Sequence, residues 1–275
     1  MMHTYPLMHT AFGRIAMCLN PRHSSLLLLE KIIFKQKRYR QITCISEQCR
    51  REILHHYKLP ANDIEIIYNG VDTGAFTPRM RLQYRDAVRE KYHVASDEVL
   101  LLFVGSGFKR KGLHHTIEAL SLIDRSKKIK LLVAGRGRMR KYLKLAQKKG
   151  ITDRVIFAGV CKHIREIYAA GDIFVFPSEY DAFGTACLEA MASGLPVIAS
   201  RTSGVSEIIS HRTDGFIINH PIAAKEIADY IKVLLEKETR ENMGAAARKT
   251  SEAFSFNANV VKTLDIYQKV LNIHR

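Results

Sequence analysis

The sequence lacks tryptophan and has only five cysteines, which are scattered along the chain. Their number is odd, they include no C-x-x-C pair, and no histidine lies near them at the spacing of a zinc site. A disulfide framework and a cysteine-based zinc site are therefore excluded, and a reducing cytoplasmic environment is expected. The cysteines are Cys18, Cys44, Cys49, Cys161 and Cys187.

A long hydrophobic run is also lacking near the start of the chain. The apolar stretch at residues 26–29 is cut by Glu30 and Lys31, whereas a membrane-spanning helix needs about 20 apolar residues. The first residues do not show the basic, apolar and small-residue order of a secretory signal. We therefore expect a cytoplasmic protein, and any membrane contact to be peripheral, on the inner face of the cytoplasmic membrane.

Acidic residues are scarce, with 27 against 43 basic ones and a formal net charge of +16. Between residues 108 and 154, fifteen basic residues face only three acidic ones. Such a charge favours anionic partners, although solvated helix faces also carry lysine without a specific partner. Nucleic acid fits poorly, because RNP, helix-turn-helix and zinc-finger patterns are absent. Phosphate groups and anionic membrane surfaces remain as partners.

From residue 99 onward, short apolar runs alternate with longer amphipathic stretches. Runs that are apolar throughout, separated by helices, predict a parallel sheet covered on both faces, which is a doubly wound, Rossmann-like α/β domain. Ligands of such sheets bind beyond the carboxyl ends of the strands. The predicted strands are 99–104, 129–134, 155–157, 173–176 and 197–199, and the predicted helices between them are 112–123, 139–149, 164–170 and 184–193.

We interpret residues 1–76 as the remnant of a first Rossmann-like domain, and residues 77–256 as a complete second one. Residues 257–275 form a final helix that is expected to pack back on the N-terminal part. A complete α/β domain needs roughly 150 residues, so the first domain is short by about half. An incomplete sheet leaves open edges, so the chain is either a truncated product or is completed by a partner chain.

The turn after the first strand of the second domain reads Gly105-Ser-Gly-Phe-Lys-Arg-Lys-Gly112. Backbone N–H groups at the following helix start, together with the cations Arg110 and Lys111, suit a diphosphate. The spacing matches neither the P-loop nor the G-x-G-x-x-G fingerprint. A solvated basic turn is the alternative interpretation.

A second constellation follows the strand at 173–176. Asp181 lies just before a predicted helix, and Glu189 lies eight positions later inside it. A buried carboxylate needs a partner, and ribose hydroxyls would supply one. Alternatively, Asp181 caps the helix and Glu189 binds neighbouring backbone.

Together these features resemble the retaining family-4 glycosyltransferases. The resemblance rests on the G-x-x-x-x-x-K-G loop, on the carboxylate and Glu separated by seven residues, and on the run L-E-A-M-A-S-G-L-P-V. Asn69-Gly-Val-Asp72 resembles the segment before their interdomain linker. The G-S-x-F-x-R-K-G loop and the Arg22-His23 region are most similar to the lipopolysaccharide-core glucosyltransferase I group.

The resemblance implies a GT-B architecture, in which residues 77–256 hold the nucleotide sugar and residues 1–76 belong to the acceptor side. It implies a catalytic role near the donor sugar for Asp181, where relatives usually have Glu, and ribose binding for Glu189. Ser106 is a second departure, because many relatives have Arg there. The remaining substrate-binding residues that it implies are Gly105, Arg110, Lys111, Phe183, Gly184 and Thr185.

The same resemblance implies that the chain transfers a hexose from a UDP-sugar to a lipopolysaccharide-core or other envelope glycan. Glucose is the expected hexose. The configuration is retained, and fixed cations stabilise the leaving diphosphate, so that neither a metal nor a cofactor is expected. The alternative is a noncatalytic donor-binding subunit that needs a partner chain. This alternative arises because the acceptor loop of the family, with its histidine, has no counterpart that can be identified in this sequence. His23 does not match that histidine by position.

Overall fold

The computed structural model describes residues 21–272, except the side chains of Arg22, His23 and Asn272. Cys18 and the side chains of the Arg22-His23 region therefore lie outside the described residues. The chain divides into two compact units, one of Met1–Tyr68 with Lys262–Arg275 and one of Asn69–Val261. The domain boundaries at 76/77 and 256/257 remain a prediction. None of the helices within residues 21–272 is long and apolar enough to cross a membrane.

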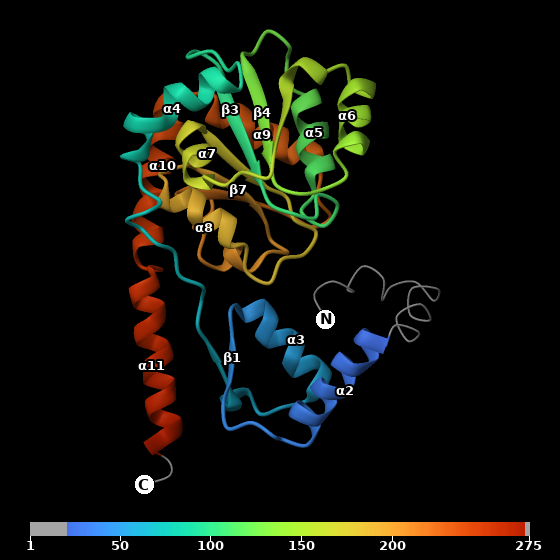
Figure 1. Ribbon diagram of the computed structural model, residues 1–275, viewed down its shortest axis with the longest axis vertical. Coiled ribbons are helices and arrows are strands. Elements are labelled where there is room, and N and C mark those ends of the chain that lie inside the picture. The colour runs from blue at the N-terminus through green and yellow to red at the C-terminus, as the bar shows by residue number, and fades with distance from the viewer. Residues whose placement is uncertain (1–20, 273–275) are drawn as a thin grey trace. The chain divides into compact units, whose positions relative to one another are not determined.

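The first unit contains a small parallel sheet of two strands (Figure 1). Its elements are α2 (Pro21–Lys35), β1 (Ile42–Cys44), α3 (Glu47–Tyr57), the 3-10 helix η2 (Ala61–Asp63) and β2 (Ile64–Ile66). Helix α3 begins after Ser46, whose hydroxyl accepts a hydrogen bond from the Cys49 amide at 3.1 Å, a favourable N-cap. The Tyr57 hydroxyl donates to the Glu30 carboxylate at 2.8 Å and so fixes α2 to α3.

The second unit is built on a parallel sheet of six strands in the order β5-β4-β3-β6-β7-β8. The chain runs outward from β3 to β5, returns to β6 beside β3, and then runs outward on the other side, so the strand order reverses between β3 and β6. The strands are β3 (Val99–Val104), β4 (Ile129–Ala134), β5 (Val155–Gly159), β6 (Ile173–Phe176), β7 (Val197–Ser200) and β8 (Gly215–Ile218).

Helices cover both faces of this sheet (Figure 1). Side chains of β3 alternate between two buried clusters: Leu101 and Phe103 join the cluster under α5, α6 and α9, whereas Leu100 and Leu102 join the one under α4, α7, α8 and α10. This confirms the predicted doubly wound α/β domain. The helices are α4 (Met80–Lys91), α5 (Leu113–Ser121), α6 (Met139–Lys148), α7 (Ile164–Ala170), α8 (Thr185–Ala192), α9 (Ala224–Leu234) and α10 (Lys237–Glu252). The last helix, α11 (Phe256–Asn272), does not cover the sheet, and its residues from Lys262 onward belong to the first unit.

Asp172, the residue before β6, ties α4 to the sheet. Its carboxylate is 4% exposed and forms ion pairs with Arg81, Arg85 and Arg89 at 3.2, 2.8 and 3.1 Å. It also accepts the Leu100 amide of β3 at 2.8 Å. The three arginines are spaced four residues apart and therefore share one face of α4. Helix α4 is thus fixed to the sheet by a buried charge cluster.

Candidate functional site

The predicted site residues lie in two loops that leave neighbouring strands. One loop, at 105–112, connects β3 to α5, and the other, at 177–184, connects β6 to α8. Since β3 and β6 pair where the strand order reverses, both loops emerge at the topological switch point. This is the position at which open α/β sheets bind their ligands.

Hydrogen bonds join the two loops directly. The Arg110 carbonyl accepts the Glu179 amide at 2.9 Å and the Ser178 hydroxyl at 3.2 Å. In the opposite direction, the Arg110 guanidinium donates to the Tyr180 carbonyl at 2.7 Å. The loops therefore form one connected structure, although their residues are about 70 positions apart in the sequence.

Asp181 is the centre of the charged part of the site. Its Oδ2 atom receives the Arg110 guanidinium at 2.8 Å and a hydrogen bond from the Lys111 ammonium. The side chains of Lys111 and Asp181 are each 12% exposed, and Arg110 is 28% exposed. Burial raises the pKa of the Asp181 carboxyl, but the attraction of Lys111 and the hydrogen bonds from both cations outweigh burial and leave this pKa below its usual range. Asp181 is therefore ionised at neutral pH.

The Lys111 ammonium also lies 4.4 Å from the centre of the Phe176 ring. This distance is that of a cation–π contact, in which the negative face of the ring attracts the charge. Lys111 is therefore held between an aromatic ring and a carboxylate, which fixes its position before any ligand arrives.

The backbone at the start of α8 lies next to this cluster. The Phe183 amide donates to Asp181 Oδ1 at 3.3 Å, Phe183 is buried, and Gly184 has a left-handed φ of 97°. Thr185 begins α8, and its hydroxyl accepts a hydrogen bond from the Asn69 side chain at 3.2 Å. The N-cap of α8 is Gly184 and no side chain caps this helix, so Asp181 does not cap α8.

Glu189 has a different partner from Asp181. Its carboxylate accepts the Tyr168 hydroxyl at 2.8 Å, and this hydroxyl also lies 3.0 Å from the Ala186 carbonyl. Burial raises the pKa of Glu189, and the hydrogen bond from Tyr168 only partly counteracts it. The structure therefore brings Arg110, Lys111 and Asp181 together and holds Glu189 separately against α7. The roles of these residues remain predictions.

Gly112 holds the two loops close together, and its replacement gives a stability test. Gly112 has a φ of 73°, and an added Cβ would lie 1.8 Å from the Pro177 carbonyl, whereas Gly107, with a φ of 78°, has open space around it. We expect Gly107→Ala to cost about 1 kcal/mol through left-handed strain, and Gly112→Ala to cost about 1 to 3 kcal/mol more through the collision. Urea unfolding of the two variants measures the difference. Equal losses would show that the contact with Pro177 is not tight.

One further cluster, which was not predicted from the sequence, lies beside these loops. His114 and His115 at the start of α5 lie against Glu179 of the loop after β6. The only signal in the sequence is the adjacent histidine pair, because Glu179 follows His115 by 64 positions. The closeness of Glu179 to the two histidines follows only from the packing of the two loops.

Comparison with known families finds two matches. Residues 85–250 match the family model of glycosyl transferases group 1, and residues 2–75 match that of glycosyltransferase family 4. The chain is 31% identical over 233 residues to an uncharacterized glycosyltransferase of Methanocaldococcus jannaschii, which covers 83% of this chain and 60% of that protein.

The lipopolysaccharide glucosyltransferase WaaG of Escherichia coli is 26% identical over 251 residues, or 90% of this chain and 67% of that protein. The chain thus spans 60% to 67% of the length of these two curated relatives. A crystal structure of WaaG shares the fold with a TM-score of 0.79 at 25% identity, over 88% of this chain and 68% of the other.

The crystal structure of Anabaena HepE in complex with UDP-glucose has a TM-score of 0.77 at 22% identity, over 91% of this chain and 70% of the other, which shows a common fold. Together with the six-stranded sheet, these findings confirm the predicted fold class: a GT-B type chain with a complete C-terminal Rossmann-like sheet and a partial N-terminal one.

Proposed function

Because the chain belongs to the glycosyl transferases group 1 family, we propose that it transfers a hexose from a UDP-sugar to an envelope glycan with retention of configuration. The observation that carries this proposal is the joining of Arg110, Lys111 and Asp181 at the switch point of the sheet. The similarity to WaaG supports a lipopolysaccharide-core acceptor and glucose as the sugar. The fold shared with the UDP-glucose complex of HepE supports the uridine nucleotide.

The two cations would stabilise the leaving group. When the bond to the sugar breaks, negative charge develops on the diphosphate, and fixed positive groups lower the energy of that charge. Arg110 and Lys111 are held by Asp181 and Phe176 before the donor binds, so little reorganisation is needed. The backbone at Gly105 and at Phe183, Gly184 and Thr185 would complete the diphosphate site, since helix starts favour anions.

Asp181 would accept hydrogen bonds from the donor sugar hydroxyls. As an anion next to the reacting carbon, it would also favour the positive charge that develops on the sugar ring. Its side chain is one methylene shorter than that of the Glu that relatives usually have at this position. It therefore reaches less far from the start of α8. Glu189 would hold the ribose, with its orientation set by the Tyr168 hydrogen bond.

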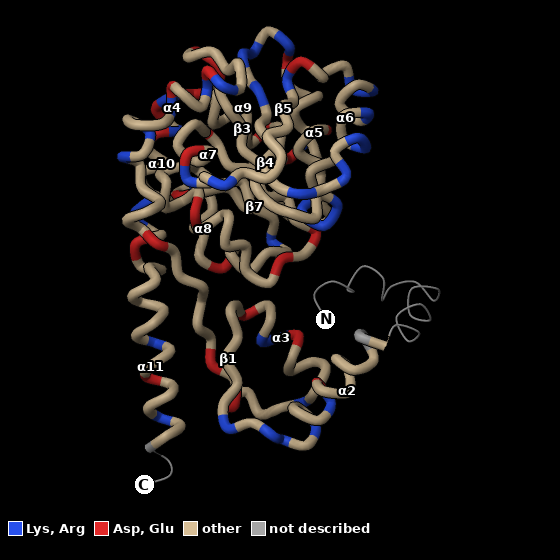
Figure 2. The backbone as a smooth tube through the Cα atoms, viewed as in Figure 1, with Lys and Arg blue, Asp and Glu red and all other residues tan. Residues whose placement is uncertain are grey.

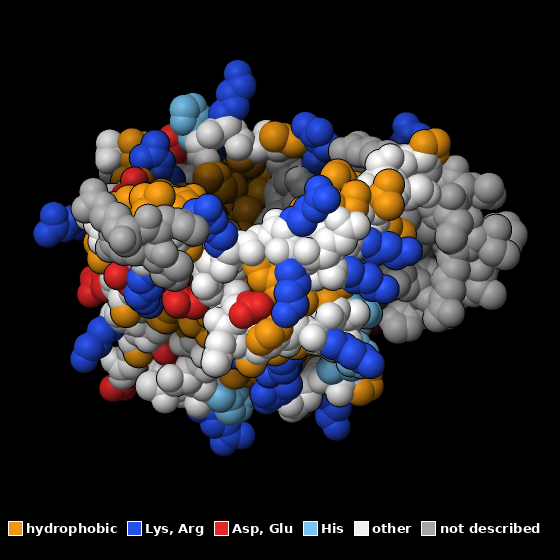
Figure 3. All heavy atoms as spheres, turned by 90° about the horizontal axis from the view of Figure 1, so that it is seen from below, with side chains coloured by type: hydrophobic (Ala, Val, Ile, Leu, Met, Phe, Trp, Pro, Cys, Tyr) orange, Lys and Arg blue, Asp and Glu red, His pale blue; other side chains and the backbone are white. Residues whose placement is uncertain are grey.

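Contact with an anionic membrane is part of the proposal, because the acceptor is a glycolipid of the envelope. Helix α6 and the turn before it carry exposed basic residues on the edge of the second unit (Figure 2). Figure 3 shows that other Lys and Arg side chains also lie at the surface. Each such residue near an anionic surface contributes about 1 kcal/mol of attraction. The residues are Arg136, Arg138, Arg140, Lys141, Lys144, Lys148 and Lys149.

A donor-binding subunit that needs a partner chain is the second candidate function. The chain spans 60% and 67% of the length of two curated relatives. In this case the site at the switch point binds the donor, and transfer requires residues from another chain. Robust turnover by the chain alone would exclude this candidate.

Donor screening by thermal shift tests the proposed function. A ligand at about 100 times its Kd adds about 2.7 kcal/mol to stability, which raises the Tm of a domain of this size by several degrees. We expect such a shift with UDP-glucose and a smaller one with ADP-glucose. The absence of a shift with every nucleotide sugar, together with no binding heat in calorimetry of the folded protein, would contradict the proposal.

A further inference from the structure

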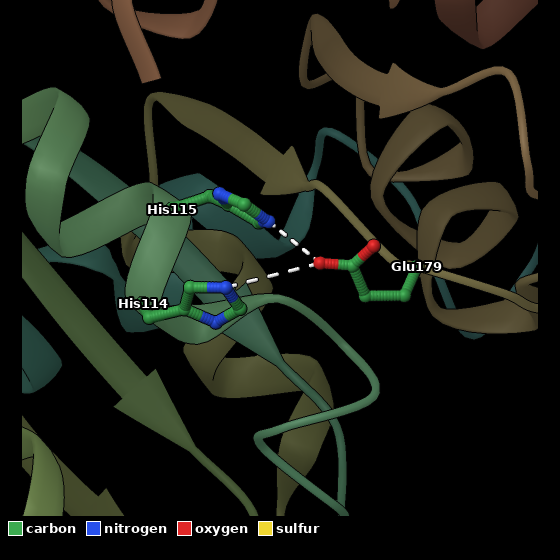
Figure 4. Close-up of side chains that lie close together, drawn as sticks. All are labelled: His114, His115 and Glu179. Atoms are coloured by element: carbon green, nitrogen blue, oxygen red, sulfur yellow. Dashed lines mark hydrogen bonds and ion pairs between the residues drawn. The ribbon is translucent and has the colours of Figure 1, made fainter. Parts of the chain in front are cut away.

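Three side chains that can ligate a metal converge beside the donor loops. His114 and His115 extend from the first turn of α5, and Glu179 faces them from the loop after β6 (Figure 4). We propose that His114, His115 and Glu179 form a binding site for a divalent transition-metal ion, with zinc as the best fit. The site goes beyond the proposed transfer reaction, which uses cations of the protein and no metal.

The distances between the donor atoms suit such an ion. His115 Nε2 lies 2.7 Å from Glu179 Oε1, and His114 Nε2 lies 3.8 Å from the same oxygen. One ligand atom from each of the three residues lies within 4.8 Å of the others. Zinc takes nitrogen and oxygen ligands at about 2.0 to 2.2 Å, so tetrahedral ligand atoms are roughly 3.3 to 3.6 Å apart. The observed distances bracket this value, and small side-chain rotations would admit the ion.

The chemistry of the set favours zinc over magnesium or calcium. Two imidazoles and one carboxylate are typical ligands of zinc and other first-row transition metals, whereas magnesium and calcium prefer oxygen ligands alone. A metal binds the imidazole ring through a nitrogen that carries no proton. A three-residue set leaves one position for water, as in open zinc sites.

The backbone holds the ligands in place and leaves them accessible. Gly112, at the start of α5, packs against the Pro177 carbonyl, and the Glu179 amide donates to the Arg110 carbonyl at 2.9 Å. The elements that bear the ligands are therefore connected by two contacts next to the cluster. The side chains are 33%, 14% and 39% exposed for His114, His115 and Glu179, so an ion can enter from solvent.

Calorimetric titration of the chelator-treated full chain with zinc chloride tests the site. We expect His115→Asn and Glu179→Gln each to weaken one zinc site by more than about 10-fold, because outer-shell changes alone cost 10- to 100-fold. The matched control is His163→Asn, since His163 is 75% exposed and lies 3.9 Å from Glu166 in a comparable histidine–glutamate pair. Zinc held elsewhere in the chain is unaffected by the changes at His115 and Glu179.

Each outcome decides the proposal. Weaker binding in both site variants, with the control unchanged, supports it. Equal isotherms for wild type and site variants would show that His115 and Glu179 form a hydrogen-bonded pair only. The wild type also decides by itself, without any variant: no zinc binding, and no rise in Tm with zinc that a chelator reverses, would overturn the site. The titration contains no nucleotide sugar, so its result is independent of the proposed function.

Discussion

Replacement of both Arg110 and Lys111 by alanine is expected to abolish most donor binding and turnover. Loss of one fixed group that stabilises a developing anion costs about 10²- to 10³-fold in kcat. For binding, each charge-assisted contact is worth about 1.5 to 3 kcal/mol, so the loss of two should raise the donor Kd by at least about 100-fold. Release of UDP from UDP-glucose in the presence of a lipopolysaccharide-core acceptor measures turnover, and calorimetry measures Kd.

The matched control for this double variant is Lys109→Ala. Lys109 lies in the same loop and has the same charge, but its side chain is exposed and it precedes the two residues that contact Asp181. We expect its effect on Kd to be less than about 3-fold, as for a solvent-screened charge. A similar loss in the control and the double variant would indicate general attraction by a basic loop. Unchanged Kd in the double variant would refute the assigned roles.

The double variant also separates the two candidate functions. If the chain binds donor but shows no turnover in its wild-type form, Kd remains the informative quantity and the second candidate is favoured. Asp181 would then lie without its two cations, so the Tm of the variant must be compared with that of the wild type. If the variant is folded but no longer binds the donor, the loss of binding is due to the changed site and not to unfolding.

The sheet was predictable because its strands are almost entirely apolar. Side chains of β3 and β4 are buried on both faces, so β3 appears as an uninterrupted hydrophobic run and β4 as a run that only Lys130 interrupts. Strand β8, which begins at a glycine and lies at the edge of the sheet, was missed. Helix α10 was missed because its buried residues include Gly244, Ala247 and Ser251, which produce little apolar periodicity. Gly244 is needed because a Cβ would lie 2.3 Å from the Gly194 carbonyl.

The candidate site was predictable only in part. Residue types after strand ends indicated where Arg110, Lys111 and Asp181 should lie, since parallel strands align their carboxyl ends. The partner of Glu189 was not predictable, because Tyr168 lies in another helix and its hydroxyl direction depends on tertiary packing. The metal-ligating cluster was missed because it depends on which loops are neighbours, and that follows from strand order.

Replacement of Asp172 by alanine is expected to cause the largest loss of stability. Arg81, Arg85 and Arg89 all form ion pairs with this carboxylate, and Arg89 is only 3% exposed. Breaking a buried ion pair by removing one partner costs about 3 to 5 kcal/mol, because the other charge is left uncompensated. The Leu100 amide would also lose its acceptor. Urea unfolding should show a lower midpoint with an unchanged m-value.

The control is Asp153→Ala, which removes a carboxylate from an ion pair with Arg125 whose side chains are 63% and 60% exposed. Such exposed pairs contribute at most about 1 kcal/mol.

The effect of Asp172 should also depend on pH. Burial raises the pKa of Asp172, but the opposite effect of its arginine partners and of the Leu100 amide is larger, so this pKa lies below its usual range. The stabilisation is therefore complete above the unfolded carboxyl pKa of about 3.9 and is lost as pH falls below it. If wild type and Asp172→Ala differed as much at pH 2 as at pH 7, the charge of Asp172 would not be the source of its effect, and α4 would be held by packing instead.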